Sequence, residues 1–249
     1  MSSLSDLRAV GSAFAAIAAS TDPEAPVRSA IWPTAGRIVD HLGNIQRWAA
    51  EVVRTGAPAD RREFRRPEDA DRARWFREGS DALVSVLEIA DPERTVPILY
   101  GATGPIRFWH RRMAHEATKH LWDLRTALDP DPRFPAEVGP DGRADAIDEF
   151  GDVFMAEARR RGIEPLAGAV ALAATDTVDA WRVRPEWVLG REPAEAASTP
   201  PAAVTISAVV GDLALLLWER ADLVAADGRF RVDGNADVAT ALATTPVHL

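Results

Sequence analysis

The spacing of apolar residues changes near positions 164–165, a Glu-Pro pair, and this change constrains the fold more than any other feature of the sequence. Before it, apolar residues recur every three or four positions, as Leu7, Val10, Phe14 and Ile17 do, which is the period of an amphipathic helix. After it, β-branched residues alternate with a period of two, which is typical of strands. The sequence therefore predicts a helical domain followed by a domain that contains a sheet.

The helical domain is predicted to span residues 1–163. Five segments have helical spacing and end at proline- or glycine-containing stretches; they cover about residues 4–19, 32–52, 67–90, 107–128 and 141–161. The arginine-rich stretch 54–67 is expected to be an exposed, solvated loop. Because the links are short, we expect an up-and-down four-helix bundle.

The second domain is predicted to span residues 164–249 and to have a smaller α+β fold. Strands are expected within 170–183 and at 204–207, divided by a Pro/Ala-rich stretch at 191–203. A strongly apolar helix should follow at 209–220. A strand or turn at 229–233 and a short helix at 236–243 complete the expected elements.

Composition excludes several classes of function. The net charge of -9 disfavours binding to nucleic acids and to anionic membranes, which both require cationic surface. No apolar run has the length of a membrane span and no secretory signal is recognisable, so a cytoplasmic location is expected. The chain has no cysteine, so any thiol chemistry must use a thiol from another molecule. The sequence carries no signature of an oligomeric state.

The stretch from Trp109 to Asp123 places two metal-ligand side chains on an otherwise apolar helical face. Glu116 and His120 are four residues apart, so on a helix both side chains can reach one ion. Asp123 lies one turn beyond His120 and could accept the second ring N–H, which would fix the tautomer and orientation of the imidazole. Arg111, Arg112, His115 and Lys119 fall on the opposite side of this helix, and His110 and His115 are expected to face solvent.

A third ligand must come from another helix, and His41 at the edge of the inward face of the second helix is the best candidate. Two histidines and one glutamate suit Zn²⁺ with an open fourth position, the arrangement of catalytic zinc sites. Nickel, iron or manganese would also accept these ligands. Three readings without metal stay open at this point: a buried ion pair between Glu116 and His120, a surface pair between His115 and Glu116, and a hydrogen-bonded core position for His41.

Three segments together resemble the mycothiol-dependent maleylpyruvate isomerase family. They are the Trp32 to Leu42 helix, the R-R-x-x-H-E-x-x-x-H-x-x-D pattern at 111–123, and the G-D-L-x-L-L-L-W-x-R helix at 211–220 followed by V-x-G-N at 232–235. The resemblance implies a DinB-like N-terminal metal-binding domain and a small C-terminal domain similar to sterol-carrier folds. It places the family's metal triad on His41, Glu116 and His120. It also fits the arginine- and alanine-rich composition, which is typical of a GC-rich actinobacterial genome.

The resemblance implies a mycothiol-dependent isomerase in which a metal-bound thiolate adds to an electrophilic double bond, rotation follows, and elimination returns the trans isomer. The same activated thiol could instead be transferred to an electrophile, as in the related thiol S-transferases. The family's C-terminal catalytic arginine falls on Arg220, which could equally only cap its helix. The expected partners are therefore a thiol cofactor and a small electrophilic substrate. A non-catalytic binding protein with a structural metal or none, and a DinB-like protein without thiol chemistry, remain the alternatives.

Overall fold

The computed structural model describes residues 4–29, 31–192, 201–224 and 228–247. The chain divides into two compact units, Met1–Gly139 and Pro140–Leu249. Within the described ranges, no helix is both long enough and apolar enough to cross a membrane.

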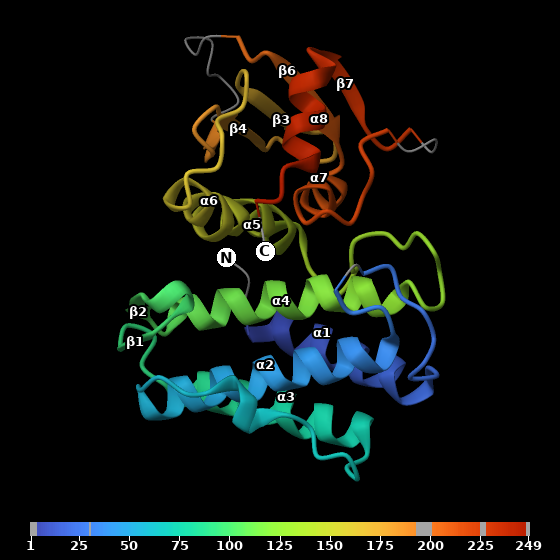
Figure 1. Cartoon of the computed structure of the whole chain (residues 1–249), viewed down its shortest axis with the longest axis vertical. Helices are drawn as coiled ribbons and strands as arrows, with labels where there is room; N and C mark the ends of the chain where they lie inside the picture. Colours follow the sequence, from blue (N-terminus) through green and yellow to red (C-terminus); the bar gives the residue numbers. More distant parts are fainter. Residues whose placement is uncertain (1–3, 30, 193–200, 225–227, 248–249) are drawn as a thin grey trace. The chain divides into compact units, whose positions relative to one another are not determined.

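The first unit is a bundle of four helices (Figure 1). Their bounds are Leu4–Ser20 for α1, Ala35–Thr55 for α2, Arg72–Ile89 for α3 and Arg107–Arg125 for α4. The predicted helical bundle is confirmed, with helix starts and ends shifted by a few residues. In the bundle α1 packs on α3 and α4, and α2 packs on the same two helices. Consecutive helices α1 and α2 are thus diagonal, unlike in a simple up-and-down bundle, because the linker at 21–34 is long enough to cross the end of the bundle.

Glycines allow α2 and α3 to approach closely. A Cβ atom at Gly43 of α2 would lie 2.2 Å from the ring of Trp75 on α3, and one at Gly79 of α3 would lie 1.8 Å from the guanidinium of Arg47 on α2. Arg47 also lies over the Trp75 ring, 4.3 Å from its centroid. The two glycines therefore make room for one interlocked cation–π pair between these helices.

A short hairpin leads into α4. Strands β1 (Thr95–Pro97) and β2 (Thr103–Pro105) pair antiparallel, around the 3-10 turn η2 (Leu99–Gly101). The first backbone N–H groups of α4 have no intrahelical partner, and here Arg107 N donates to Pro92 O at 2.9 Å while Ile106 N donates to Arg94 O at 3.0 Å. The turn that precedes the hairpin thereby fixes the start of the helix that carries Glu116 and His120.

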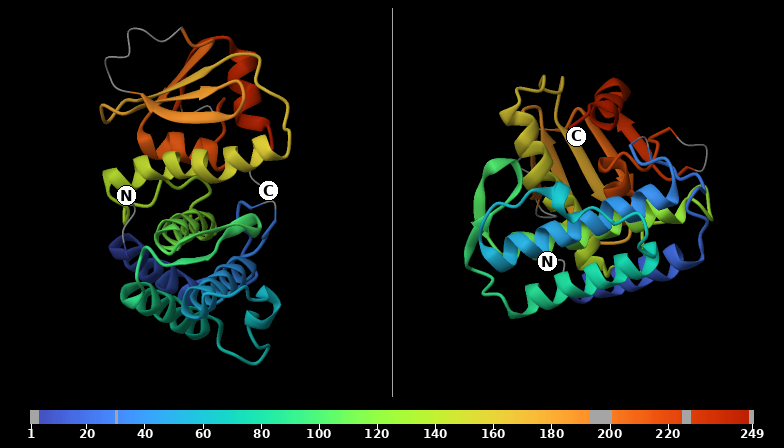
Figure 2. Two further views of the ribbon diagram at one scale, coloured as in Figure 1. Left: turned by 90° about the vertical axis from the view of Figure 1, so that its left-hand side faces the viewer. Right: turned by 60° about the horizontal axis from the view of Figure 1, so that its bottom comes forward.

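The second unit has a five-stranded mixed sheet in the order β5-β4-β3-β6-β7. Figure 2 shows its strands as arrows. The strands are β3 Val170–Ala174, β4 Ala180–Arg184, β5 Val188–Glu192, β6 Val204–Ala208 and β7 Arg231–Gly234. Only β3 and β6 pair in parallel among the described strands; the other pairs are antiparallel. The helices are α7 (Val210–Leu217) and α8 (Ala236–Thr244), preceded by α5 (Pro140–Phe150), which continues through the π-turn η3 (Gly151–Met155) into α6 (Ala156–Arg160).

The predicted α+β class of this unit is confirmed, but α5 and α6 also belong to it. The sequence placed the domain boundary after residue 163, whereas the compact units divide between Gly139 and Pro140. The reason is packing: α5 contacts α7 and β5 of the sheet unit. Strand β5 was not predicted, and the remainder of the Pro/Ala-rich stretch at 193–200 lies outside the described residues.

Candidate metal centre

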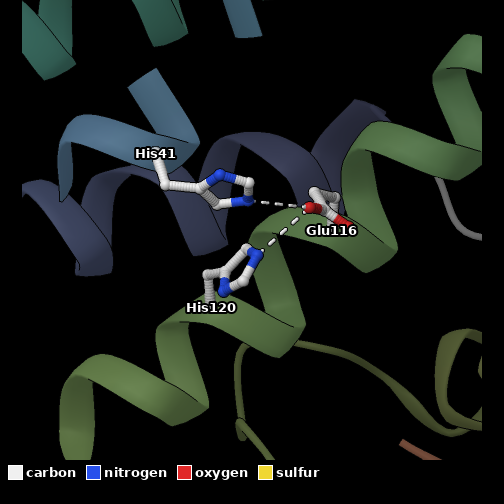
Figure 3. A group of neighbouring side chains, drawn as sticks. All are labelled: His41, Glu116 and His120. Atoms are coloured by element: carbon white, nitrogen blue, oxygen red, sulfur yellow. Dashed lines mark hydrogen bonds and ion pairs between the residues drawn. The ribbon is translucent and has the colours of Figure 1, made fainter. Parts of the chain in front are cut away.

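Three side chains from two helices of the first unit converge on one point (Figure 3). His41 comes from α2, and Glu116 and His120 come from successive turns of α4. One ligand atom of each residue lies within 4.8 Å of the others. Glu116 Oε1 is 3.4 Å from His41 Nε2 and 3.1 Å from His120 Nε2. The exposed fractions of the side chains are 11%, 12% and 3% for His41, Glu116 and His120, so the set is nearly buried.

Neighbouring side chains fix the orientation of both imidazole rings. Asp123, which is fully buried, lies with Oδ2 2.8 Å from His120 Nδ1. This contact directs Nε2 of His120 toward Glu116. The ring of Trp32 stacks on His41 with centroids 4.5 Å apart and an interplanar angle of 24°. Trp32 therefore restricts the rotation of His41 and covers one of its faces.

The two oxygens of Glu116 have different surroundings. Oε1 faces the two histidines, whereas Oε2 accepts from Arg112 and lies 3.3 Å from Lys119 Nζ. Burial on its own would raise the pKa of Glu116, but Lys119, Arg112 and His120 together hold this pKa well below its usual value. Glu116 is therefore an anion with one oxygen held and the other directed at the imidazoles.

The pKa of His41 is lowered from its ordinary value of 6.5 to about 4, mainly because burial disfavours the charged form. The hydrogen bond with Glu116 opposes this shift, and the nearby His120 adds to it. At neutral pH His41 is therefore an uncharged imidazole, the form that binds metal ions.

The donor set fits a divalent metal ion. Two ligand atoms on a tetrahedral zinc ion lie roughly 3.3 Å apart when the metal–ligand bonds are about 2.0–2.1 Å, and both contacts of Glu116 Oε1 are close to that spacing. When the proton of a neutral His120 is on Nδ1, toward Asp123, its Nε2 carries a lone pair that faces the carboxylate oxygen. That arrangement is favourable with a cation between the two atoms or with a doubly protonated ring. The buried ion pair thus remains the alternative to metal.

The expectation that His110 and His115 face solvent is wrong. Arg112, His115 and Lys119 are buried, and His110 is half-buried with Nε2 3.1 Å from Leu87 O. The polar character of this helix suggested one exposed face, yet it is buried on nearly all sides. Arg112 and Lys119 are spaced four and three residues from Glu116, so helical spacing alone could have identified them as its partners.

Arg220 lies just beyond the end of α7, in the second unit. Its backbone N–H donates to Leu215 O at 2.8 Å, and the backbone N–H of Glu219 donates to Leu216 O at 3.0 Å. Glu219 is in the left-handed region at φ 60°. Together these features form a Schellman motif at the end of α7. The Arg220 guanidinium donates to Trp218 O at 2.6 Å. The helix-capping role that the sequence left open for this arginine is therefore observed.

Comparison with known proteins places the bundle in a family. The model of the mycothiol maleylpyruvate isomerase N-terminal domain matches residues 4–125, which contain all three converging side chains. Residues 4–125 belong to this domain family. The chain also resembles the crystal structure of mycothiol-dependent maleylpyruvate isomerase, with 12% identity, a TM-score of 0.59, and coverage of 92% of this chain and 91% of that one.

Two further structures are similar to parts or most of the chain. A histidine-to-alanine variant of mycothiol-dependent maleylpyruvate isomerase matches with 13% identity, a TM-score of 0.54, and coverage of 88% of each chain. Sterol Carrier Protein 2 Like 2 from Aedes aegypti matches with 17% identity and covers 42% of this chain and 97% of its own, at a TM-score of 0.34 that is too low to support an argument. At these identities the likeness to the isomerase establishes the fold alone. The chain matches no curated protein.

Proposed function

We propose that this protein is a metal- and mycothiol-dependent enzyme that activates a thiol for addition to a small electrophilic molecule, with cis–trans isomerisation as the first candidate reaction. The observation that carries the proposal is the convergence of His41 Nε2, Glu116 Oε1 and His120 Nε2, which leaves room for a fourth ligand in a three-donor set. The family of the bundle and the absence of cysteine agree with a thiol supplied by a cofactor.

When bound, the metal ion would act as a Lewis acid that lowers the pKa of a coordinated thiol. The chain's own residues have separate tasks. Asp123 holds the ring of His120, and Trp32 holds that of His41. Arg112 and Lys119 keep Glu116 ionised and fix its second oxygen. Because these partners lock the ligands before the ion arrives, little reorganisation is needed for binding.

Zinc is the proposed metal because a set of two histidines and one glutamate with an open position suits it, although other divalent ions compete for such ligands. Arg220 remains a proposed catalytic residue that would hold a substrate carboxylate. A cytoplasmic location likewise remains a prediction. Transfer of the thiol to an electrophile is the second reaction that the same ligand set would serve.

The test combines metal analysis with calorimetry. Purified protein should contain or take up one equivalent of zinc and then bind mycothiol, and both properties should be lost in His41→Ala and His120→Ala. His110→Ala is the matched control, because this histidine lies on the same helix but contacts Leu87 O. A wild-type protein that takes up no zinc would refute the proposal and favour a binding protein whose Glu116 and His120 form an ion pair.

A further inference from the structure

The arginine-rich stretch between α2 and α3 is anchored beside the candidate metal centre. It contains the single 3-10 turn η1 (Arg61–Phe64). Asn44 Nδ2 donates to Arg61 O at 2.8 Å, and Trp48 Nε1 donates to Ala59 O at 2.9 Å. His41, Asn44 and Trp48 are separated by three and four residues, so they lie on one face of α2. The stretch is thus tied to the same helical face that presents His41, and it is not a free loop.

The guanidinium of Arg61 lies over the ring of Trp48, 5.6 Å from its centroid. Within the described part of the chain, no hydrogen bond or ion pair holds this guanidinium. Other arginines nearby are paired: Arg62 with Asp60, and Arg66 and Arg72 with Asp40. Arg61 therefore has its hydrogen-bond donors available.

The electrostatic surroundings of Arg61 connect it to the ligand set. Partial burial lowers the pKa of Arg61, and the nearby charge of Glu116 opposes that shift. Glu116 does not satisfy the guanidinium, because its Oε2 is held by Arg112 and Lys119 while its Oε1 faces the histidines. Arg61 is an exposed residue, so its guanidinium is within reach of solvent as well as within the field of Glu116, and it has no anionic partner of its own. It is therefore available to an anion that enters the centre from solvent.

We propose that Arg61 is a specificity-determining residue that binds a carboxylate of the small molecule occupying the candidate metal centre. A guanidinium presents two parallel N–H groups that match the two oxygens of one carboxylate, and the cation–π contact with Trp48 would restrict where that fork can lie. The substrate class is therefore a carboxylic acid whose reactive carbon lies a short distance from the carboxylate. This inference rests on the proposed function, which supplies the reactive centre.

The experiment uses metal-free protein with ¹⁵N-labelled tryptophan, and it follows the indole N–H signal of Trp48, assigned with Trp48→Phe. Succinate is the probe, at constant ionic strength, and succinamide is the uncharged probe of the same shape. Succinate should shift the Trp48 signal saturably, and succinamide should not. Arg61→Gln should weaken succinate about 10- to 100-fold, the effect of losing a hydrogen bond to a charged group. Arg61→Lys should weaken it less, because the charge remains without the fork.

Arg62→Ala is the matched control, since it lies on the same turn with its guanidinium already paired to Asp60. Unchanged binding in Arg62→Ala together with loss in Arg61→Gln supports the proposal. Equal loss in both variants, an undiminished shift in Arg61→Gln, or no saturable shift in wild type overturns it. Zinc uptake is measured in parallel. If the protein binds succinate through Arg61 but takes up no zinc, the carboxylate site is supported and the proposed metal-dependent function is refuted. Failure of the carboxylate site and failure of the proposed function are therefore distinguishable.

Discussion

Asp123 Oδ2 lies 2.8 Å from His120 Nδ1, and both residues are on the same helix, one turn apart. The contact leaves Nε2 of His120 as the atom that faces Glu116. Asp123 thereby determines which nitrogen of the ring is available to a metal ion, although it lies too far along the helix to be a ligand in the set itself.

Replacing Asp123 with Asn should weaken zinc binding about 10- to 100-fold, as is typical when the hydrogen-bond partner of a ligand histidine is lost. The amide is isosteric but carries no charge, and it can present either an acceptor or a donor to the ring. Competition with a chromogenic chelator measures the affinity. Equal zinc affinity in Asp123→Asn and wild type would show that Asp123 does not orient a ligand.

Replacing Lys119 with Met should destabilise the metal-free protein and increase the stabilisation that zinc provides. Lys119 Nζ is 3.3 Å from Glu116 Oε2, so it stabilises the buried carboxylate but repels a divalent ion at the same place. The melting temperature with and without zinc measures both effects. An identical zinc-induced shift in variant and wild type would contradict the electrostatic account of Glu116.

The metal-free protein should lose stability as the pH falls from 6.5 towards about 4. The folded state keeps His41 neutral, with a pKa lowered to about 4, while the unfolded state binds the proton near 6.5, so acid favours unfolding in this window. The free energy of unfolding that depends on a neutral His41 is of order 3 kcal/mol, at about 1.4 kcal/mol for each unit of pKa shift. This stabilisation is fully present above pH 6.5 and is lost as the pH falls to about 4.

Urea unfolding of wild type and His41→Gln checks this pH dependence. The unfolding free energy of the variant should change less with pH between 6.5 and 4.5 than that of wild type. Glu116 does not interfere in this range, because its pKa in the folded protein is lowered and the stability that it provides is lost only at more acidic pH. Parallel slopes for the two proteins would rule out a buried, neutral His41.

Replacing Gly43 with Ala should cost about 1–3 kcal/mol of unfolding free energy, because the new methyl group would meet the Trp75 ring of α3. Gly139→Ala is the matched control, since a Cβ atom there has no neighbour within 4 Å. Chemical denaturation measures both. A Gly43→Ala variant as stable as the control would show that α2 and α3 do not pack at this distance.

Helical spacing predicted the bundle and put Glu116 and His120 on one face, because residues four apart on a helix are neighbours whatever the rest of the fold does. His41 was predicted from its place at the edge of the inward face of the second helix, and the packing of α2 on α4 brings it to the other two. Helical spacing misjudged His110 and His115, since most residues of this helix are buried and a polar pattern then marks no solvent face. The role of the three converging residues as metal ligands remains a prediction.

Tertiary contacts account for the remaining differences. The stretch 54–67 is exposed at most positions, as predicted, but hydrogen bonds from Asn44 and Trp48 also anchor it to α2, which the sequence did not predict. These bonds join residues 11 to 17 positions apart, beyond the reach of local patterns. Strand β5 was missed because the turn before it is formed by Trp187, whose backbone is in the left-handed region at φ 60°. Tryptophan rarely adopts this conformation, so nothing in the sequence indicated a turn there.

The most direct test of the candidate metal centre is a crystal structure of zinc-treated protein with anomalous data collected on both sides of the zinc absorption edge. We expect one strong anomalous peak about 2.0–2.2 Å from His41 Nε2, Glu116 Oε1 and His120 Nε2, with a fourth position open to water or a thiol. Well-ordered side chains at these three residues without an anomalous peak between them would contradict the account.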